Sequence, residues 1–365
     1  PKQLEALGDI HYGGLASGNL RDLPLHGACR PALGAITTDG SFRADSLFDH
    51  MTYDARVVAR NFRLGRMLGV KKLGTVTVDV SSAGAIDEGK VNGDVKAHAR
   101  KLTYNNYTYA DLSLNGHYSP QRYMGSFAIH DPHLDVSFDG VVDTRDASPE
   151  VNCNLVCRQF DSAPLELPWV GDRLRTRFSL AIDMSGTNPD DISGYAVLDS
   201  LYLATSRDSL LMRQMKLIAS AGADGSKAVT LTADYMNGEV DGEFRYRDIV
   251  PAAQALMHHY LPTAVATPKQ EWRPVEFFLS LQGERLRDVQ RLFAAPLTIS
   301  DHPTLTADVS VSPEREGREP QVNLRFFAPG VLAGNTPVHE LTVTLNTIDT
   351  LRHTGANGSG LALSV

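Results

Sequence analysis

Four side chains of the kinds that bind metals or exchange protons occur together in the segment H-D-P-H-L-D, namely His130, Asp131, His133 and Asp135. A metal site needs three or four such donors that converge on one point. Successive side chains of a β-strand point to opposite faces of the sheet. His130 and Asp131 directly precede Pro132, where the first strand is expected to end. His133 and Asp135 fall on the polar side of the next strand. We interpret the segment as a solvated strand corner and predict no metal ion and no other cofactor.

The common local catalytic motifs are absent from the sequence. The sequence contains no Gly-x-Ser-x-Gly elbow, no Walker phosphate loop and no His-Glu-x-x-His helix. Asp139, Asp143 and Asp146 resemble part of a calcium loop but lack its sixth-position glycine and its closing glutamate. His258 and His259 are adjacent in an expected helix and point about 100° apart, so they cannot chelate one ion. We predict that the protein is not an enzyme and has no catalytic residues.

Amino-acid composition and net charge exclude further classes of protein. The chain has 365 residues, of which 42% are hydrophobic and 21% charged, which is typical of a folded protein. Its formal charge is −8, and no clustered basic face is visible in the sequence, so we predict no nucleic-acid binding. No run of 18 apolar residues is present, and we expect an internal fragment without an anchor. Its three cysteines fit buried apolar positions and leave the redox compartment open.

The dominant pattern is alternation of apolar and polar residues with a period of two. It recurs along most of the chain and predicts about 20 antiparallel strands. Asn-Gly at 92, 115, 237 and 357 and Asp-Gly at 39, 139, 224 and 241 are interpreted as hairpin turns. Further glycines inside the strand patterns, such as Gly116, Gly125, Gly140, Gly194 and Gly242, predict bends and hence a strongly curved sheet.

Short helices are expected at 62–69, 249–261 and 285–293, where apolar residues recur at helical spacing. The segment 262–274 contains three prolines and no periodicity, so we place a linker there. This boundary predicts a first curled β block at 1–261 that ends in a short helix, and a second block at 275–365 that continues the same sheet.

A ladder of about 20 strands would expose an apolar face on the order of 1,500 Å², far more than soluble monomers usually show. The few short helices are too small to cover it. We therefore expect an elongated, all-β, antiparallel sheet that curls into a U-shaped trough, apolar inside and polar outside. Side chains of the protein would fill part of the trough, and a hydrophobic ligand would fill the rest.

Several segments resemble the strand and turn style of TamB and other AsmA-like proteins of the Bacteroidota type. They are L-G-D-I-H-Y-G-G-L-A-S-G-N-L-R-D-L-P-L-H-G at 7–27, A-L-G-A-I-T-T-D-G at 32–40, L-T-Y-N-N-Y-T-Y-A-D-L-S-L-N-G at 102–116, G-S-F-A-I-H-D-P-H-L-D-V-S-F-D-G-V-V-D at 125–143 and P-L-T-I-S-D at 296–301. The resemblance implies a periplasmic apolar β-groove that moves phospholipid between membranes. It also implies an inner-membrane anchor before this chain and, after it, a part that meets an outer-membrane assembly barrel.

We thus predict a lipid conduit that holds phospholipid acyl chains in an apolar groove and supports outer-membrane biogenesis. Two alternatives remain open: a β-sandwich scaffold or adhesin that binds no lipid, and a polysaccharide-active enzyme. The residues expected to line the groove are apolar and lie on strands: Phe127, Ile129, Leu134, Val136, Phe138, Phe178, Leu180, Ile182, Leu231, Phe244 and Phe278.

Overall fold

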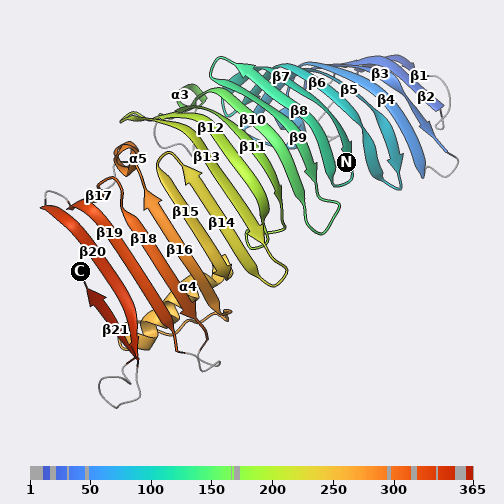
Figure 1. Cartoon of the computed structure of the whole chain (residues 1–365). Helices are drawn as coiled ribbons and strands as arrows, with labels where there is room; N and C mark the ends of the chain where they lie inside the picture. The colour runs from blue at the N-terminus through green and yellow to red at the C-terminus, as the bar shows by residue number, and fades with distance from the viewer. Residues whose placement is uncertain are drawn as a thin grey trace. The chain divides into compact units, whose positions relative to one another are not determined.

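The structure, a computed structural model, describes residues 11–16, 22–30, 33–45, 49–165, 167, 173–293, 297–313, 319–333, 336–349 and 359–364. It confirms an all-β fold, with 21 strands assigned to one antiparallel sheet that is not closed (Figure 1). The first strands are β1 (His11–Ala16), β2 (Asp22–Arg30), β3 (Ala35–Ala44), β4 (His50–Phe62), β5 (Leu73–Asp87), β6 (Lys90–Tyr104), β7 (Tyr107–Ser119), β8 (Arg122–Asp131), β9 (Leu134–Asp143), β10 (Glu150–Asp161) and β11 (Arg175–Ser185).

The remaining strands are β12 (Ser193–Ala204), β13 (Ser209–Ala221), β14 (Ser226–Ala233), β15 (Met236–Glu243), β16 (Val275–Gly283), β17 (Leu297–Ile299), β18 (Thr304–Val311), β19 (Gln321–Ala333), β20 (Thr336–Asp349) and β21 (Ser359–Ser364). The helices are α2 (Leu64–Leu68), α3 (Ser162–Leu165), α4 (Tyr246–Tyr260) and α5 (Leu286–Phe293). Three of them overlap the predicted helical segments, and α4 begins three residues earlier than expected.

The chain divides into two units. Unit 1 comprises 1–181 and 202–206, and unit 2 comprises 182–201 and 207–365. The expected linker at 262–274 lies within unit 2, because β15 and β16 are hydrogen-bonded neighbours with Glu243 opposite Glu276. Helix α4 and the segment 262–274 are therefore an insertion between two paired strands.

The strands from β4 to β10 each have one apolar and one polar face, as the period-two pattern predicts. Because paired residues lie on the same face, the pairings assemble apolar rows that cross many strands. One such row is Val57, Val80, Ala97, Leu114, Phe127, Phe138 and Leu155, from β4 to β10. We call the face that carries this row the apolar face of unit 1.

The apolar face of unit 1 is the inner side of a bend. Gly125 belongs to this face, and a Cβ built there would lie 2.3 Å from the carbonyl oxygen of Asn115 on the neighbouring strand. At Gly140 a Cβ would lie 2.7 Å from Cα of Cys153. Neighbouring backbone thus leans over this face so closely that only glycine fits. Figure 1 shows the strands β3 to β9 bending along their length. The predicted curvature is confirmed for this unit.

Most of the Asn-Gly and Asp-Gly pairs are not hairpin turns, contrary to the prediction. Those at 39, 92, 115, 139, 237 and 241 lie inside strands, and only Asp224-Gly225 falls in a turn between described strands. The pair at 357 lies outside the described residues. A tight turn instead forms at Asn105 and Asn106, whose φ angles of 49° and 66° suit a type I′ turn between β6 and β7. The glycines within strands instead allow the backbone of neighbouring strands to approach closely where the sheet bends.

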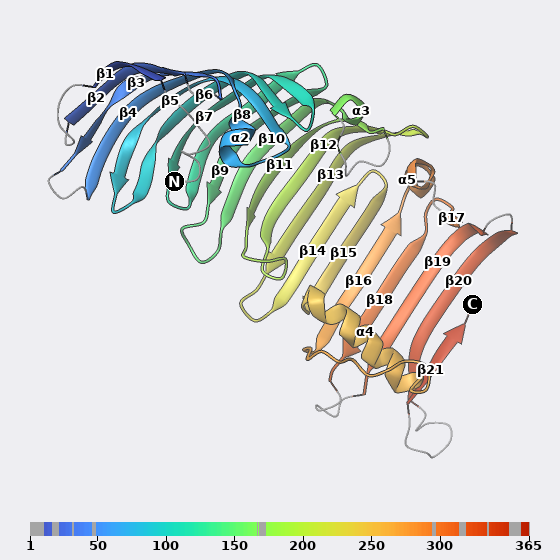
Figure 2. The same ribbon diagram turned by 180° about the vertical axis from the view of Figure 1, so that it is seen from behind.

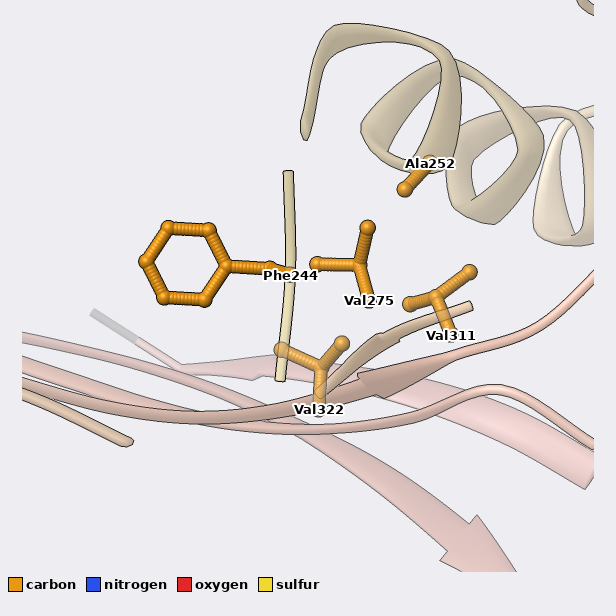
Figure 3. Packing of buried hydrophobic residues seen from close by; sticks show 5 residues of the cluster. All are labelled: Phe244, Ala252, Val275, Val311 and Val322. Atoms are coloured by element: carbon orange, nitrogen blue, oxygen red, sulfur yellow. The ribbon is translucent and has the colours of Figure 1, made fainter. Parts of the chain in front are cut away.

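Two small cores form where a helix meets the apolar side of the sheet. In unit 1, Phe62 and Val76 are buried, and Leu64 and Met67 from α2 pack against their cluster. In unit 2, α4 lies across the strands β16 and β18, as Figure 2 shows. Figure 3 shows the residues of this core: Ala252 of α4, the strand residues Val275, Val311 and Val322, and Phe244, which follows β15.

Candidate functional site

The apolar face of unit 1 brings together five of the predicted groove residues. Phe127 pairs with Phe138, Ile129 pairs with Val136, and Leu134 lies opposite Asp131. All five are half-buried. An apolar side chain in this state still exposes part of its surface to solvent, and burying that surface is favourable at about 25 cal/mol per Å². This part of the sheet can therefore accept additional apolar matter.

Phe178, Leu180 and Ile182 share one face of β11 and are also half-buried. They alternate with the exposed Arg177 and Asp183, as the period-two pattern predicts. The division between the units falls after Ala181, so Phe178 and Leu180 belong to unit 1 and Ile182 to unit 2.

A small polar cluster, not anticipated from the sequence, lies on the apolar face near the bend. The Tyr53 and Tyr118 hydroxyl groups contact each other across Gly84 and Gly93, and the Ser82 hydroxyl lies 3.1 Å from the Tyr118 oxygen. Burial raises the pKa of Tyr53. The two glycines leave room for the rings, because a Cβ on either one would meet the Tyr53 oxygen. The sequence does contain a signal for this cluster: the tyrosines and glycines occupy strand positions that face the same side of the sheet.

Tyr123 extends this cluster toward β8. Its ring lies over Gly116 and Gly125, which again lack the Cβ that would collide with it. Its hydroxyl group is buried and has no hydrogen-bond partner among the described residues, and burial raises its pKa. The apolar face therefore carries one buried hydroxyl group without a hydrogen-bond partner among the described residues, which is unusual for a buried polar atom.

Asp131 is not a solvated corner residue, which corrects the interpretation of the H-D-P-H-L-D segment. Its carboxylate is 5% exposed and accepts hydrogen bonds from the Tyr107 hydroxyl at 2.5 Å and from the backbone N–H groups of Ala110 and His133 at 3.0 and 2.9 Å. This buried carboxylate, with its hydrogen bonds satisfied, ties β7 to the end of β8 and to the turn that follows β8. Its role is structural.

His130 and Asp135, two other polar residues of that segment, lie on the polar side as expected. They form a side-chain contact of 3.0 Å. Arg158 also reaches Asp135, at 3.4 Å. In the described part of the chain, no group of three or more His, Cys, Asp or Glu residues is arranged to hold a metal ion.

Unit 2 has its own apolar face, on which Leu231 pairs with Leu217 and Gly238. Phe278 does not belong to it, contrary to the prediction. It pairs with Asp241 and Asp308 on the polar face and is 43% exposed. The physical reason is the doubled phenylalanine in V-E-F-F-L-S-L, where the parity of Val275, Phe277, Leu279 and Leu281 defines the apolar side.

Phe244 is a second correction, because it is buried beneath α4 rather than lining an open surface. Beside it lies Lys227, whose side chain is only 5% exposed. The Lys227 ammonium is 4.9 Å from the centre of the Phe244 ring, 4.7 Å from that of Tyr246 and 2.5 Å from the Asp190 carboxylate. Asp190 also accepts the backbone N–H of Tyr246 at 2.8 Å. This ion pair fastens the first turn of α4 to the sheet.

The described residues thus place half-buried apolar side chains of several strands on one face of unit 1. Among the residues that the structure describes, no helix combines the length and apolar character needed to cross a membrane. Comparison of the chain with models of protein families, with curated proteins and with solved structures finds no match.

Proposed function

We propose that the protein binds the acyl chains of phospholipids on the apolar face of its curled sheet and passes them between the two membranes of a Gram-negative envelope. One observation carries the proposal. A row of apolar side chains continues from β4 to β10 on the inner side of the bend in unit 1, and these side chains are only half-buried. Each methylene removed from water contributes about 0.8 kcal/mol. A face of many similar strand pairs offers a hydrocarbon chain successive positions of similar energy.

The rest of the proposal follows the resemblance. It places the protein in the periplasm, with attachment to the inner membrane on one side and to an outer-membrane assembly barrel on the other, and it assigns no enzymatic step to the chain. A scaffold that binds no lipid is the alternative favoured by unit 2, where α4 covers Val275, Val311 and Val322. The experiment must therefore distinguish lipid on the apolar face from an apolar face that is simply a thin core.

Native mass spectrometry of gently purified protein tests the proposal. We expect phospholipid to copurify with the wild-type chain and a fluorescent fatty acid to compete for the same site. Phe138→Asp, on the apolar face, should abolish both signals, whereas Ser137→Asp, its neighbour on the polar face of β9, should leave them unchanged. Circular dichroism verifies that both variants are folded. Absence of lipid and of fatty-acid binding in the wild-type chain, or equal binding by the two variants, would establish the scaffold instead.

A further inference from the structure

The polar face of unit 1 carries a hollow lined by basic side chains. Its volume is about 680 Å³, and its charged lining consists of Arg56, Arg60, Lys96, Arg100 and Asp79, with His98 beside them. The four Lys and Arg residues come from β4 and β6, and Asp79 comes from β5, which runs between those two strands. We call this feature the basic hollow.

The basic hollow has an excess of positive charge. Asp79 is held by Arg56, with contacts of 2.9 and 2.5 Å, and the hydrogen bond from Arg56 lowers the pKa of Asp79. Within the described part of the chain, Arg60, Lys96 and Arg100 form no ion pair. His98 is paired with Asp111 at 2.7 Å. Among the residues that line the hollow, one carboxylate therefore faces four permanent cations, and Asp39 on β3 acts on Arg56 from outside the lining.

The local charge is opposite to that of the whole chain. Residues 55–102 contain ten Lys and Arg but four Asp and Glu, whereas the whole chain has 35 Lys and Arg and 43 Asp and Glu. Clustering of like charge is unfavourable unless an anion offsets it. Such a cluster on one small area of an otherwise acidic protein indicates an anionic ligand.

The geometry indicates what kind of anion fits. Arg56 and Lys96 pair with the same residue, Ser81, from opposite sides, so their Cα atoms are about 10 Å apart. Arg56 and Arg60 are four residues apart on one strand, a separation of about 13 Å. Arginine forks match phosphate oxygens in a bidentate manner. Cations at these spacings suit several phosphate groups on one compact molecule better than a single small anion.

A long polyanion such as nucleic acid fits less well. The hollow has the volume of a small-molecule pocket, and the chain outside residues 55–102 carries 25 Lys and Arg against 39 Asp and Glu. A strand of nucleic acid that extended beyond the hollow would meet this repulsive field. A compact ligand would be affected mainly by the local charges, because at physiological salt distant exposed charges are screened beyond about 8 Å.

We propose that the basic hollow binds a compact ligand that bears several phosphate groups. The ligand is either a soluble phosphorylated compound or the phosphorylated headgroup of a lipid, since both present the same chemistry. This site is on the polar face and is independent of the acyl-chain binding proposed above. Loss of one activity should therefore leave the other intact.

Isothermal titration calorimetry with inorganic tripolyphosphate tests the site. The full chain should bind saturably at low salt, and the affinity should fall as sodium chloride is raised. Lys96→Glu should weaken binding about tenfold by charge reversal, whereas Lys90→Glu, on the same strand outside the hollow, should have less than about a twofold effect. Asp79→Asn should strengthen binding several-fold because it removes the one carboxylate in the lining of the hollow.

Competition assigns the source of the phosphates. Displacement of tripolyphosphate by phosphatidylcholine vesicles that contain phosphatidic acid would indicate a lipid headgroup, and failure to displace it would indicate a soluble ligand. Absence of saturable binding, equal affinity of Lys96→Glu and Lys90→Glu, or weaker binding by Asp79→Asn would overturn the proposal. So would stronger binding of a single-stranded oligonucleotide that carries the same total charge.

Discussion

Replacing Lys227 should destabilise unit 2 far more than replacing an exposed lysine. The ammonium group is almost completely buried, contacts two aromatic rings and pairs with Asp190, which in turn holds the first N–H group of α4. Lys227→Met keeps the aliphatic volume but leaves Asp190 without its cation. Removal of one partner from a buried pair costs about 3–5 kcal/mol. Because the Asp190 side chain is 25% exposed and can be partly hydrated, we expect the lower limit, about 3 kcal/mol.

The assay is urea denaturation followed by tryptophan fluorescence. The chain has two tryptophans, and Trp272 packs against the core beneath α4, so a Trp169→Phe background makes Trp272 the single reporter. The matched control is Lys216→Met, an exposed lysine on β13, which should change the free energy of unfolding by less than about 0.5 kcal/mol. The double variant Lys227→Met/Asp190→Asn should be more stable than the sum of the single effects predicts, by about 2 kcal/mol, because neither charge is then left alone.

The same pair gives a pH dependence with a defined sign. Burial raises the pKa of Asp190, but the hydrogen bonds from Lys227 and from the Tyr246 N–H lower it more, so the net change is downward. A carboxylate with a depressed pKa adds stability above its unfolded pKa of about 4 and loses it as the pH falls. Lys227→Met should therefore flatten the acid limb of the stability curve. A cost below about 1 kcal/mol, or additive single effects, would refute the buried-pair reasoning.

Two further predictions concern unit 1. Gly125→Val should lower the free energy of unfolding by about 3 kcal/mol or more, measured by thermal denaturation, because its Cβ would lie 2.5 Å from Cα of Gly116; Gly13→Ala, with no atom within 4 Å, should be neutral. Equal melting temperatures of these two variants would contradict the tight bend. Asp131→Asn should lower the pKa of Tyr107, which burial and then the Asp131 hydrogen bond raise. Ultraviolet titration of tyrosinate measures this, and an unchanged titration curve would exclude the proposed contact.

The sequence contains enough information for the fold class because its main signal is local. Alternation along a strand is set by residues two apart, so the face shared by Phe127 and Ile129 could be predicted without knowing the neighbours. The same reasoning failed at the doubled Phe277 and Phe278, where one residue of offset exchanges the faces. It also failed at Asn-Gly pairs such as Asn115-Gly116, because a glycine required by a bend and one required by a turn look alike in sequence.

The features that could not be predicted depend on long-range pairing. Lys227 and Asp190 are 37 residues apart, and Lys227 follows the turn residues Asp224, Gly225 and Ser226, where a lysine is usually exposed. The basic hollow joins Arg56 to Lys96 only because β5 separates β4 from β6 by one strand. The sequence contains the basic segment 55–102, but without that register it does not show which of its cations share one face.

The close-approach glycines lie at corresponding points of β7, β8 and β9, so in this part of unit 1 each strand contributes its own share of the bend. Gly116, Gly125 and Gly140 pair directly with one another on β7, β8 and β9. A hairpin that carries glycine at this level can be inserted or deleted without altering how its neighbours fold over. The length of such a protein can thus evolve by duplication in steps of two strands, about 10 Å each, while its profile stays constant.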